Sequence, residues 1–212
     1  MKRTIIYSAF AILTLLSCNK VNQSGEINNQ IKANTNDPLN FKNGYSEVNG
    51  IKMYYEIYGK GKPLVLIHGG GSTIQSSFEK VIPQLSKNRK VIGVELQGHG
   101  RTSDRKTDFS FEQDADDIAT LLKNLNIDNA DFFGFSNGGT TALQIAIRHP
   151  EIIDKIILGS ALSKRNGVPE EFWGFMKQAR LENMPEQLKE AYNKMTIRFD
   201  KHWNTKGRQQ RQ

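Results

Sequence analysis

The sequence predicts an α/β protein whose mostly parallel sheet is flanked by helices on both faces. The main observation is that short apolar runs alternate with amphipathic stretches of helical spacing from about residue 63 to residue 159. A second observation is length, because 212 residues suffice for one substantial hydrophobic core, and no internal repeat is evident. We therefore expect one α/β domain with additional segments at its two ends.

A β-hairpin is predicted to open the ordered chain near Tyr45. Asn49 and Gly50 stand between two strand-like runs, and both residue types accept the positive φ that a two-residue hairpin turn requires. In the second run, residues 51–58, Ile51, Met53, Tyr55 and Ile57 alternate with Lys52, Tyr54, Glu56 and Tyr58. This alternation predicts a strand with one buried and one exposed face.

The elements after the hairpin follow in a regular order, and six strands are predicted in all. Helix starts are indicated by two capping boxes, Ser76-x-x-Glu79 and Ser110-x-x-Gln113, each followed by apolar residues at helical spacing. The further strands are expected at residues 63–67, 90–95, 130–135 and 155–159, with a third helix at 140–148. Residues 161–199 break this order with two helix-like pieces, which predict a partial helical cap.

The N-terminal segment has the pattern of an export signal. Lys2 and Arg3 precede an apolar run of about a dozen residues, too short for a transmembrane helix, which needs about 20. The run ends in Leu-Leu-Ser-Cys, which resembles the lipobox of bacterial lipoproteins, and Cys18 is the only cysteine. We expect a protein of the bacterial cell envelope, anchored to a membrane by lipid on Cys18. The alternative is an ordinary signal peptide with an incidental cysteine.

These patterns divide the chain into five predicted parts. They are a signal peptide at 1–17, a lipid-anchored flexible tether at 18–43, an incomplete α/β core at 44–160, a helical cap segment at 161–199 and a disordered tail at 200–212. The net charge of +7 arises mostly outside the core, which holds 13 basic and 14 acidic side chains between residues 44 and 160. No basic face is therefore expected, and the charge pattern argues against nucleic acid as a partner.

Two glycine-rich motifs carry the chemistry that the sequence predicts. Gly134-Phe135-Ser136-Asn137-Gly138-Gly139 follows a predicted strand and opens a helix, so Ser136 is expected on a tight turn that projects its hydroxyl. His68-Gly69-Gly70-Gly71 ends an earlier strand, and its glycines let backbone N–H groups approach a developing oxyanion. The pattern Gly-x-Ser-x-Gly alone is a weak signal, but it is much stronger between a strand and a helix and about 65 residues after the strand that ends in His-Gly-Gly-Gly.

The chain thereby resembles the α/β-hydrolase fold family, specifically its bacterial serine hydrolases with an inserted helical cap. The likeness covers residues 45–198 and includes Glu95-Leu96-Gln97-Gly98-His99-Gly100-Arg101-Thr102 and Arg148-His149-Pro150-Glu151. The resemblance implies that Ser136 is the nucleophile, that Gly70 and Asn137 supply oxyanion donors, and that Gly71 is a possible further donor. It also implies a small ester-like substrate, with no metal and no organic cofactor.

The acid and the histidine of a catalytic triad are the parts that the sequence does not supply in the expected order. In this family both follow the nucleophile, each after a later strand. His68 and His149 are expected to be structural, and His99 is expected to brace the site or line its pocket, since it precedes the nucleophile. His202 stands in a segment without strand or helix pattern. We therefore expect a C-terminally truncated hydrolase that lacks the last two strands. The alternative function is a non-catalytic lipid-anchored binding protein or an inactive hydrolase fragment.

Overall fold

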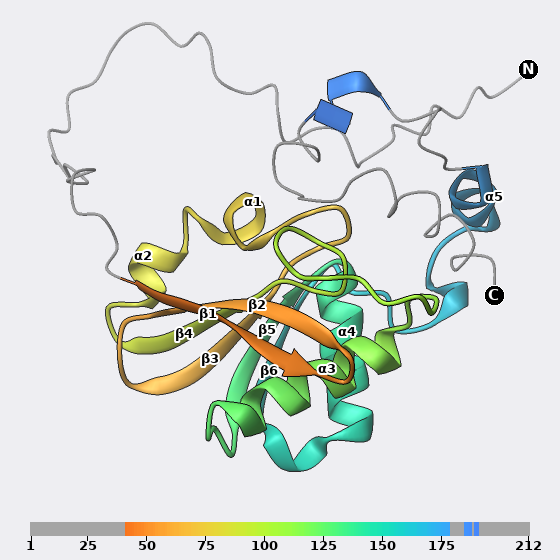
Figure 1. Ribbon diagram of the computed structural model, residues 1–212. Helices are drawn as coiled ribbons and strands as arrows, with labels where there is room; N and C mark the ends of the chain where they lie inside the picture. The colour runs from red at the N-terminus through yellow and green to blue at the C-terminus, as the bar shows by residue number, and fades with distance from the viewer. Residues whose placement is uncertain (1–40, 179–184, 188, 191–212) are drawn as a thin grey trace, which may run out of the picture. The chain divides into compact units, whose positions relative to one another are not determined.

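A six-stranded mixed sheet forms the centre of the protein (Figure 1). The computed structural model describes residues 41–178, 185–187, 189 and 190. Its strands are β1 (Phe41–Val48), β2 (Ile51–Tyr58), β3 (Lys62–Ile67), β4 (Arg89–Val94), β5 (Ala130–Phe135) and β6 (Ile153–Gly159). Its helices are α1 (Ile74–Phe78), α2 (Ile82–Leu85), α3 (Phe111–Asn124), α4 (Asn137–Arg148) and α5 (Glu170–Gln178), with short 3₁₀ turns η1 (Pro150–Ile152) and η2 (Arg165–Gly167).

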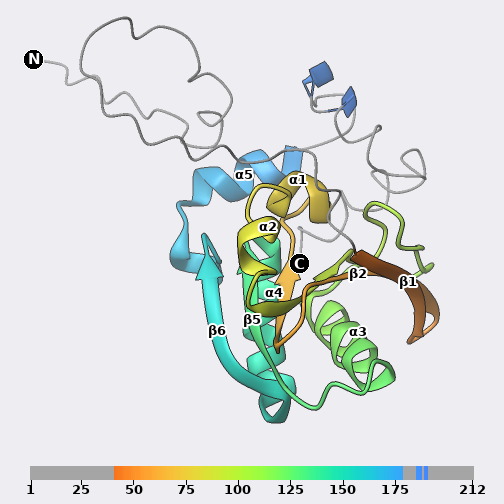
Figure 2. The ribbon, with the colours of Figure 1, turned by 90° about the vertical axis from the view of Figure 1, so that its left-hand side faces the viewer.

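The strand order in the sheet is β1-β2-β4-β3-β5-β6. β2 is antiparallel to both β1 and β4, whereas β4, β3, β5 and β6 run parallel. Figure 2 shows β1 and β6 at opposite edges of the sheet. The mostly parallel sheet with flanking helices that the sequence predicts is therefore confirmed. Because parallel strands share a direction, the ends of β3, β4 and β5 bring the loops that follow them to one edge.

The predicted hairpin forms with the expected turn. Asn49 and Gly50 have φ angles of 43° and 86°, so both occupy the left-handed region that a type I′ turn needs. β1 begins at Phe41, earlier than the predicted domain start at residue 44. Ladder pairing with β2 through Phe41↔Tyr58 and Lys42↔Ile57 extends the strand into residues predicted as tether. Composition could not reveal this, because long-range pairing stabilises a polar edge strand.

The two sides of the sheet pack against different helices. Val65 and Ile67 of β3 belong to the core under α3 and α4, whereas Leu64 and Leu66 belong to the core under α1 and α2. Successive side chains of a strand point to opposite faces, so a strand buried on both faces is apolar throughout. In Figure 1, α1 and α2 lie on the other side of the sheet from α3.

The prediction of an exposed face on β2 is wrong. Tyr54, Glu56 and Tyr58 are buried, with Glu56 fully enclosed. The side chains lie on the face that α1 and α2 cover, and both tyrosine hydroxyls donate to the Glu56 carboxylate. Periodicity identified the two faces correctly, but tyrosine and a paired carboxylate can line an interior when their polar atoms find partners.

The helix predicted to begin at Ser76 is also different in the structure. Thr73 is the N-cap, and Ser76 is the third helical residue that completes the capping box with it. The segment then forms two short helices instead of one, with Pro83 in the first turn of α2. A proline deeper inside one continuous helix would lose a hydrogen bond and strike the preceding turn, so the chain breaks and restarts.

The remaining predicted elements agree more closely with the structure. Ser110 caps α3 by accepting a hydrogen bond from the Gln113 backbone N–H at 3.0 Å. α4 starts at Asn137, three residues before the predicted position. No helix among the described residues combines the length and apolar character that crossing a membrane requires. Cys18, the signal peptide, the tether before residue 41, most of the second cap piece and the tail lie outside the described residues.

Candidate active site

Ser136 stands on a strained turn between β5 and α4. Its φ and ψ angles are 54° and −118°, a backbone conformation that non-glycine residues rarely adopt. The turn is held from both sides, because the Ser136 N–H donates to the Gly159 carbonyl of β6 at 2.7 Å and the Ser136 carbonyl accepts from Gly139 at 2.9 Å. Strain of this kind persists only where the surroundings fix it, and it is typical of a functional site.

Two glycines of the Gly134–Gly139 motif are required by close backbone contacts. A Cβ on Gly134 would collide with the backbone of Gly138, and a Cβ on Gly138 would collide with the carbonyl oxygens of Ile67 and His68. The helix can therefore begin directly against β5 and the end of β3. The spacing of these glycines around Ser136 thus follows from the sharpness of the turn.

The glycine loop, residues 68–73, lies against this turn. A Cβ built on Gly69 would be 3.4 Å from the Ser136 Cβ, and one built on Gly70 would be 2.5 Å from the Asn137 Nδ2. Asn137 is the first residue of α4, so its N–H has no acceptor within the helix. The structure thus brings Ser136, Gly70 and Asn137 together, as the two motifs predict.

His68 and His99 connect the glycine loop to the loop that follows β4, residues 95–103. The Gly71 N–H donates to His99 Nε2 at 3.0 Å, and the Leu96 N–H donates to His68 Nε2 at 3.1 Å. Both imidazoles are buried. The structural role predicted for His68 is confirmed. The Gly71 N–H, which the sequence predicts as a possible further oxyanion donor, instead donates to His99.

A buried charge cluster supports the 95–103 loop, and sequence reasoning missed it. Arg101 bonds to two fully buried carboxylates, with Nη1 at 2.9 Å from Glu56 and Nη2 at 2.5 Å from Glu95. Its guanidinium carbon also lies 3.8 Å from the centre of the Tyr54 ring. Burial raises the pKa of the Tyr54 and Tyr58 phenols, and their hydrogen bonds to Glu56 raise it further. Both phenols therefore remain donors. The sequence did contain a sign of these buried carboxylates, because Glu56 and Glu95 each occur within an otherwise apolar strand pattern.

The general base is the component that the described residues do not provide. The Ser136 hydroxyl has no hydrogen-bond partner within the part of the chain that the structure describes. His68 and His99 use both ring nitrogens in bonds to the two loops. His149 bonds to Asp116 at the C-terminal end of α4, as its predicted structural role requires. His202 lies outside the described residues.

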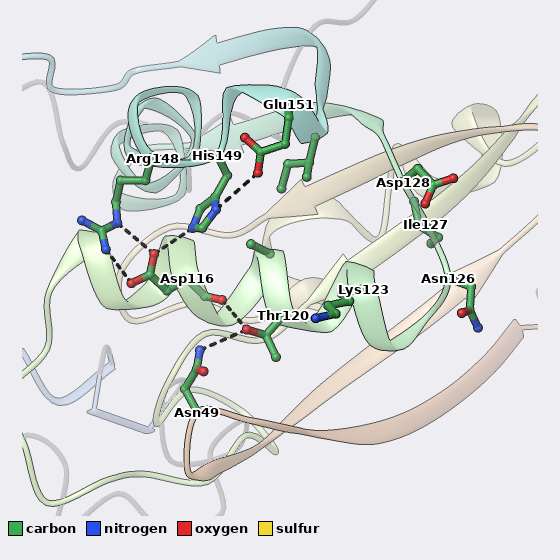
Figure 3. A pocket seen from close by; sticks show the side chains of 12 residues that line it. Asn49, Asp116, Thr120, Lys123, Asn126, Ile127, Asp128, Arg148, His149 and Glu151 are labelled. Atoms are coloured by element: carbon green, nitrogen blue, oxygen red, sulfur yellow. Dashed lines mark hydrogen bonds and ion pairs between the residues drawn. The ribbon is translucent and has the colours of Figure 1, made fainter.

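A pocket of about 870 Å³ lies at the other end of α4 (Figure 3). α4 has 12 residues, so this end is roughly 18 Å from Ser136 at 1.5 Å per residue. Several of the side chains that line the pocket bond to one another. Asp116 accepts from Arg148 Nε and His149 Nε2, both at 2.8 Å, and Asn49 donates to Thr120 at 3.2 Å. These bonds connect α3, α4 and the β1–β2 turn, which is a structural role.

The fold and the strained serine turn define a class of α/β proteins, in which a mostly parallel sheet carries a serine on a strand-to-helix turn. Residues 62–206 match the family model described as the alpha/beta hydrolase fold. The match covers more than half of the chain, and the chain therefore belongs to the α/β-hydrolase fold family.

Several of the relatives detected by sequence are named as hydrolases. The chain is 39% identical over 117 residues to 2-hydroxymuconate semialdehyde hydrolase of Pseudomonas sp. (strain CF600), covering 53% of this chain and 41% of that protein. It is 32% identical over 116 residues to 2-hydroxy-6-oxo-6-(2'-aminophenyl)hexa-2,4-dienoic acid hydrolase of Metapseudomonas resinovorans, covering 53% and 40%. The matched region thus spans less than half the length of these relatives.

Two solved structures at 28% and 29% sequence identity share the fold. Est816, described as an N-acyl homoserine lactone degrading enzyme, superposes with a TM-score of 0.56 at 28% identity, covering 70% of this chain and 64% of that chain. A carboxylesterase structure from the thaumarchaeon Nitrososphaera gargenis gives a TM-score of 0.59 at 29% identity, covering 71% and 57%. The family predicted from the two motifs is thereby confirmed.

Proposed function

We propose that this protein is a serine hydrolase that cleaves small esters or related carbonyl compounds through an acyl-enzyme. The observation that supports it most strongly is the strained turn at Ser136 packed against the glycine loop. In this scheme the Ser136 oxygen attacks the carbonyl carbon, and the carbonyl oxygen becomes an oxyanion. The leaving group departs with a proton, and water then attacks the acyl-enzyme to release the acid and restore the serine hydroxyl.

Gly70 and Asn137 are the backbone donors that we assign to the oxyanion. The Asn137 N–H begins a 12-residue helix, whose N-terminal partial positive charge favours an anion. Gly70 lies beside Asn137 and can approach because it has no Cβ. We do not assign Gly71, because its N–H donates to His99. Each oxyanion donor is worth about 10²–10³ in rate.

The general base and its orienting acid must come from residues outside those described. Serine attack at neutral pH requires a base, commonly histidine, within hydrogen-bond reach of the hydroxyl. His202 is one candidate in the sequence. A base contributed by any other segment would serve the same chemistry, because the oxyanion donors and the nucleophile are already adjacent.

A fluorophosphonate probe tests this assignment on the 212-residue protein. We expect covalent labelling that Ser136→Ala abolishes. Ser160→Ala is the matched control, because Ser160 also follows a parallel strand with φ of 54° and should leave labelling unchanged. Labelling that survives in the Ser136→Ala protein would refute Ser136 as the nucleophile. A folded wild-type protein that neither labels nor hydrolyses p-nitrophenyl acetate would favour the non-catalytic alternative.

We also propose that the protein is a lipoprotein of the bacterial cell envelope, with the acyl chains on Cys18. The supporting observation is the Leu-Leu-Ser-Cys sequence after a short apolar run, with no second cysteine in the chain. Expression in a bacterium fed radiolabelled palmitate should label the wild-type protein and place it in the membrane fraction. Cys18→Ala should abolish both results, and a labelled Cys18→Ala protein would exclude this anchor.

A further inference from the structure

Two buried histidines exchange hydrogen bonds between the glycine loop and the 95–103 loop. His68 of the glycine loop accepts from Leu96, and His99 of the 95–103 loop accepts from Gly71. The two rings lie side by side, with their centroids 5.0 Å apart. Each loop therefore holds the other through one imidazole, so the arrangement is reciprocal.

The partners fix the proton position on each imidazole. A backbone N–H can only donate, so the Nε2 atom that it meets must carry no proton. The proton must then be on Nδ1, where His68 donates to the Gly69 carbonyl at 2.7 Å and His99 donates to the Gln97 carbonyl at 3.0 Å. Both rings are thus neutral in this arrangement, and each connects an N–H of the opposite loop to a carbonyl of its own loop.

The 95–103 loop is held by hydrogen bonds to β2 and to the buried Glu95. Thr102 Oγ1 donates to the Glu95 carbonyl at 2.6 Å and accepts from the Tyr54 N–H of β2 at 2.9 Å. The Arg101 N–H and guanidinium both bind the buried Glu95 carboxylate. Gly100 has φ of 51°, and a Cβ there would collide with that carboxylate. His99 is therefore attached to a loop that buried ion pairs fix in place.

We infer that His99 is a positioning residue for the oxyanion donors. By binding the Gly71 N–H, its Nε2 sets the path of the glycine loop and leaves Gly70 beside Asn137 and Ser136. The consequence for acyl transfer rests on the proposed function. The control of the loop by His99 does not.

Two substitutions of similar size distinguish the effect of losing the hydrogen bond to Gly71 from the effect of losing the volume of the imidazole ring. A glutamine amide reaches about as far as imidazole Nε2, so His99→Gln keeps an acceptor for Gly71. An asparagine amide reaches only about as far as Nδ1, so His99→Asn keeps a donor for the Gln97 carbonyl and loses the acceptor. His149→Gln is the control for replacing a histidine elsewhere, since His149 contacts Asp116 at the far end of α4.

Hydrogen exchange of the Gly71 amide, measured by NMR on the folded proteins, is the primary test. We expect exchange roughly 10- to 100-fold faster in His99→Asn, because the partly buried Gly71 N–H would lose its acceptor. Exchange in His99→Gln should stay within about three-fold of wild type, and His149→Gln should not change it. Equal protection in the wild-type and His99→Asn proteins would overturn the inference, as would an equal acceleration in His149→Gln.

Two further readouts separate this inference from the proposed function. Long-range ¹H–¹⁵N correlations should place the His99 proton on Nδ1, and a proton on Nε2 would overturn the inference. If Ser136 is labelled by a fluorophosphonate, labelling should slow about ten-fold or more in His99→Asn and stay within about three-fold in His99→Gln. Absence of labelling in the wild type would refute the proposed function alone, because the exchange result still decides the role of His99.

Discussion

Replacing Arg101 by methionine should destabilise the protein strongly. Glu56 and Glu95 are both fully buried, and Arg101 is the cation that bonds to each. Removing one member of a buried ion pair typically costs about 3–5 kcal/mol because the remaining charge is uncompensated. Some donors would remain. The Tyr54 and Tyr58 hydroxyls and Gln75 Nε2 still donate to Glu56, and the backbone N–H of residue 101 still donates to Glu95 at 2.6 Å. We therefore expect the lower end, about 3 kcal/mol.

That loss is a substantial fraction of the free energy of unfolding, which is roughly 5–15 kcal/mol for a typical domain. With a urea m value of about 2 kcal/mol per molar, the unfolding midpoint followed by far-UV circular dichroism should fall by about 1.5 M. Arg148→Met is the matched control. Its bidentate bond to Asp116 is partly exposed, so its removal should cost less than about 1 kcal/mol.

Arg101→Lys provides a second comparison. Lysine keeps the positive charge but lacks the planar fork that bonds to both carboxylates, so its stability should fall between wild type and Arg101→Met. The reasoning would be refuted by an Arg101→Met midpoint within about 0.3 M of wild type. It would equally be refuted by an Arg148→Met loss as large as that of Arg101→Met.

Three other substitutions test separate features. Gly138→Ala should destabilise the protein by at least about 2 kcal/mol, because its Cβ would collide with two carbonyl oxygens. Gly174→Ala in α5 is the control, because its Cβ would meet nothing within 4 Å and the change should be neutral or slightly stabilising. Urea titration of the two variants measures the difference. Burial raises the pKa of the Asp131 carboxyl, but hydrogen bonds from Arg89 and Lys62 outweigh this effect and lower the pKa. The ionised carboxylate therefore stabilises the fold at pH values above the unfolded pKa near 3.9. This stabilisation is lost as the pH falls through the lower pKa of the folded protein. Asp131→Asn should abolish that loss in thermal unfolding measured from about pH 5 to 2, and an unchanged profile would contradict it. Ile157 on edge strand β6 is 53% exposed, so Ile157→Lys should reduce concentration-dependent light scattering while changing stability by less than about 0.5 kcal/mol. Scattering that does not change would show that this edge does not drive association.

Local rules were enough for much of the fold. The positive φ at Asn49 and Gly50, the cap at Ser110 and the bounds of β5 follow from nearest-neighbour sterics and hydrogen bonding, which the sequence encodes directly. The turn at Ser136 was predictable for the same reason, because glycines at fixed spacing are needed wherever a strand meets a helix so abruptly. The family assignment follows from these local signals taken in order.

Other features depended on contacts between distant segments. β1 begins at Phe41 because β2 pairs with it, and no property of residues 41–43 themselves indicates a strand. The second face of β2 is buried because α1 and α2 cover it. The split between these two helices involves Pro83, but their placement on the sheet does not follow from the local pattern.

The sequence by itself determined the position of Ser136 in a strand-to-helix turn and its two motif partners, Gly70 and Asn137. Those are properties of short segments whose backbone geometry permits few residue types. Only the tertiary structure decided that His99 engages the Gly71 N–H and that Arg101 joins Glu56 to Glu95. The physical reason is that buried polar groups are partnered across the fold, and sequence spacing contains no information on which distant donor meets which acceptor.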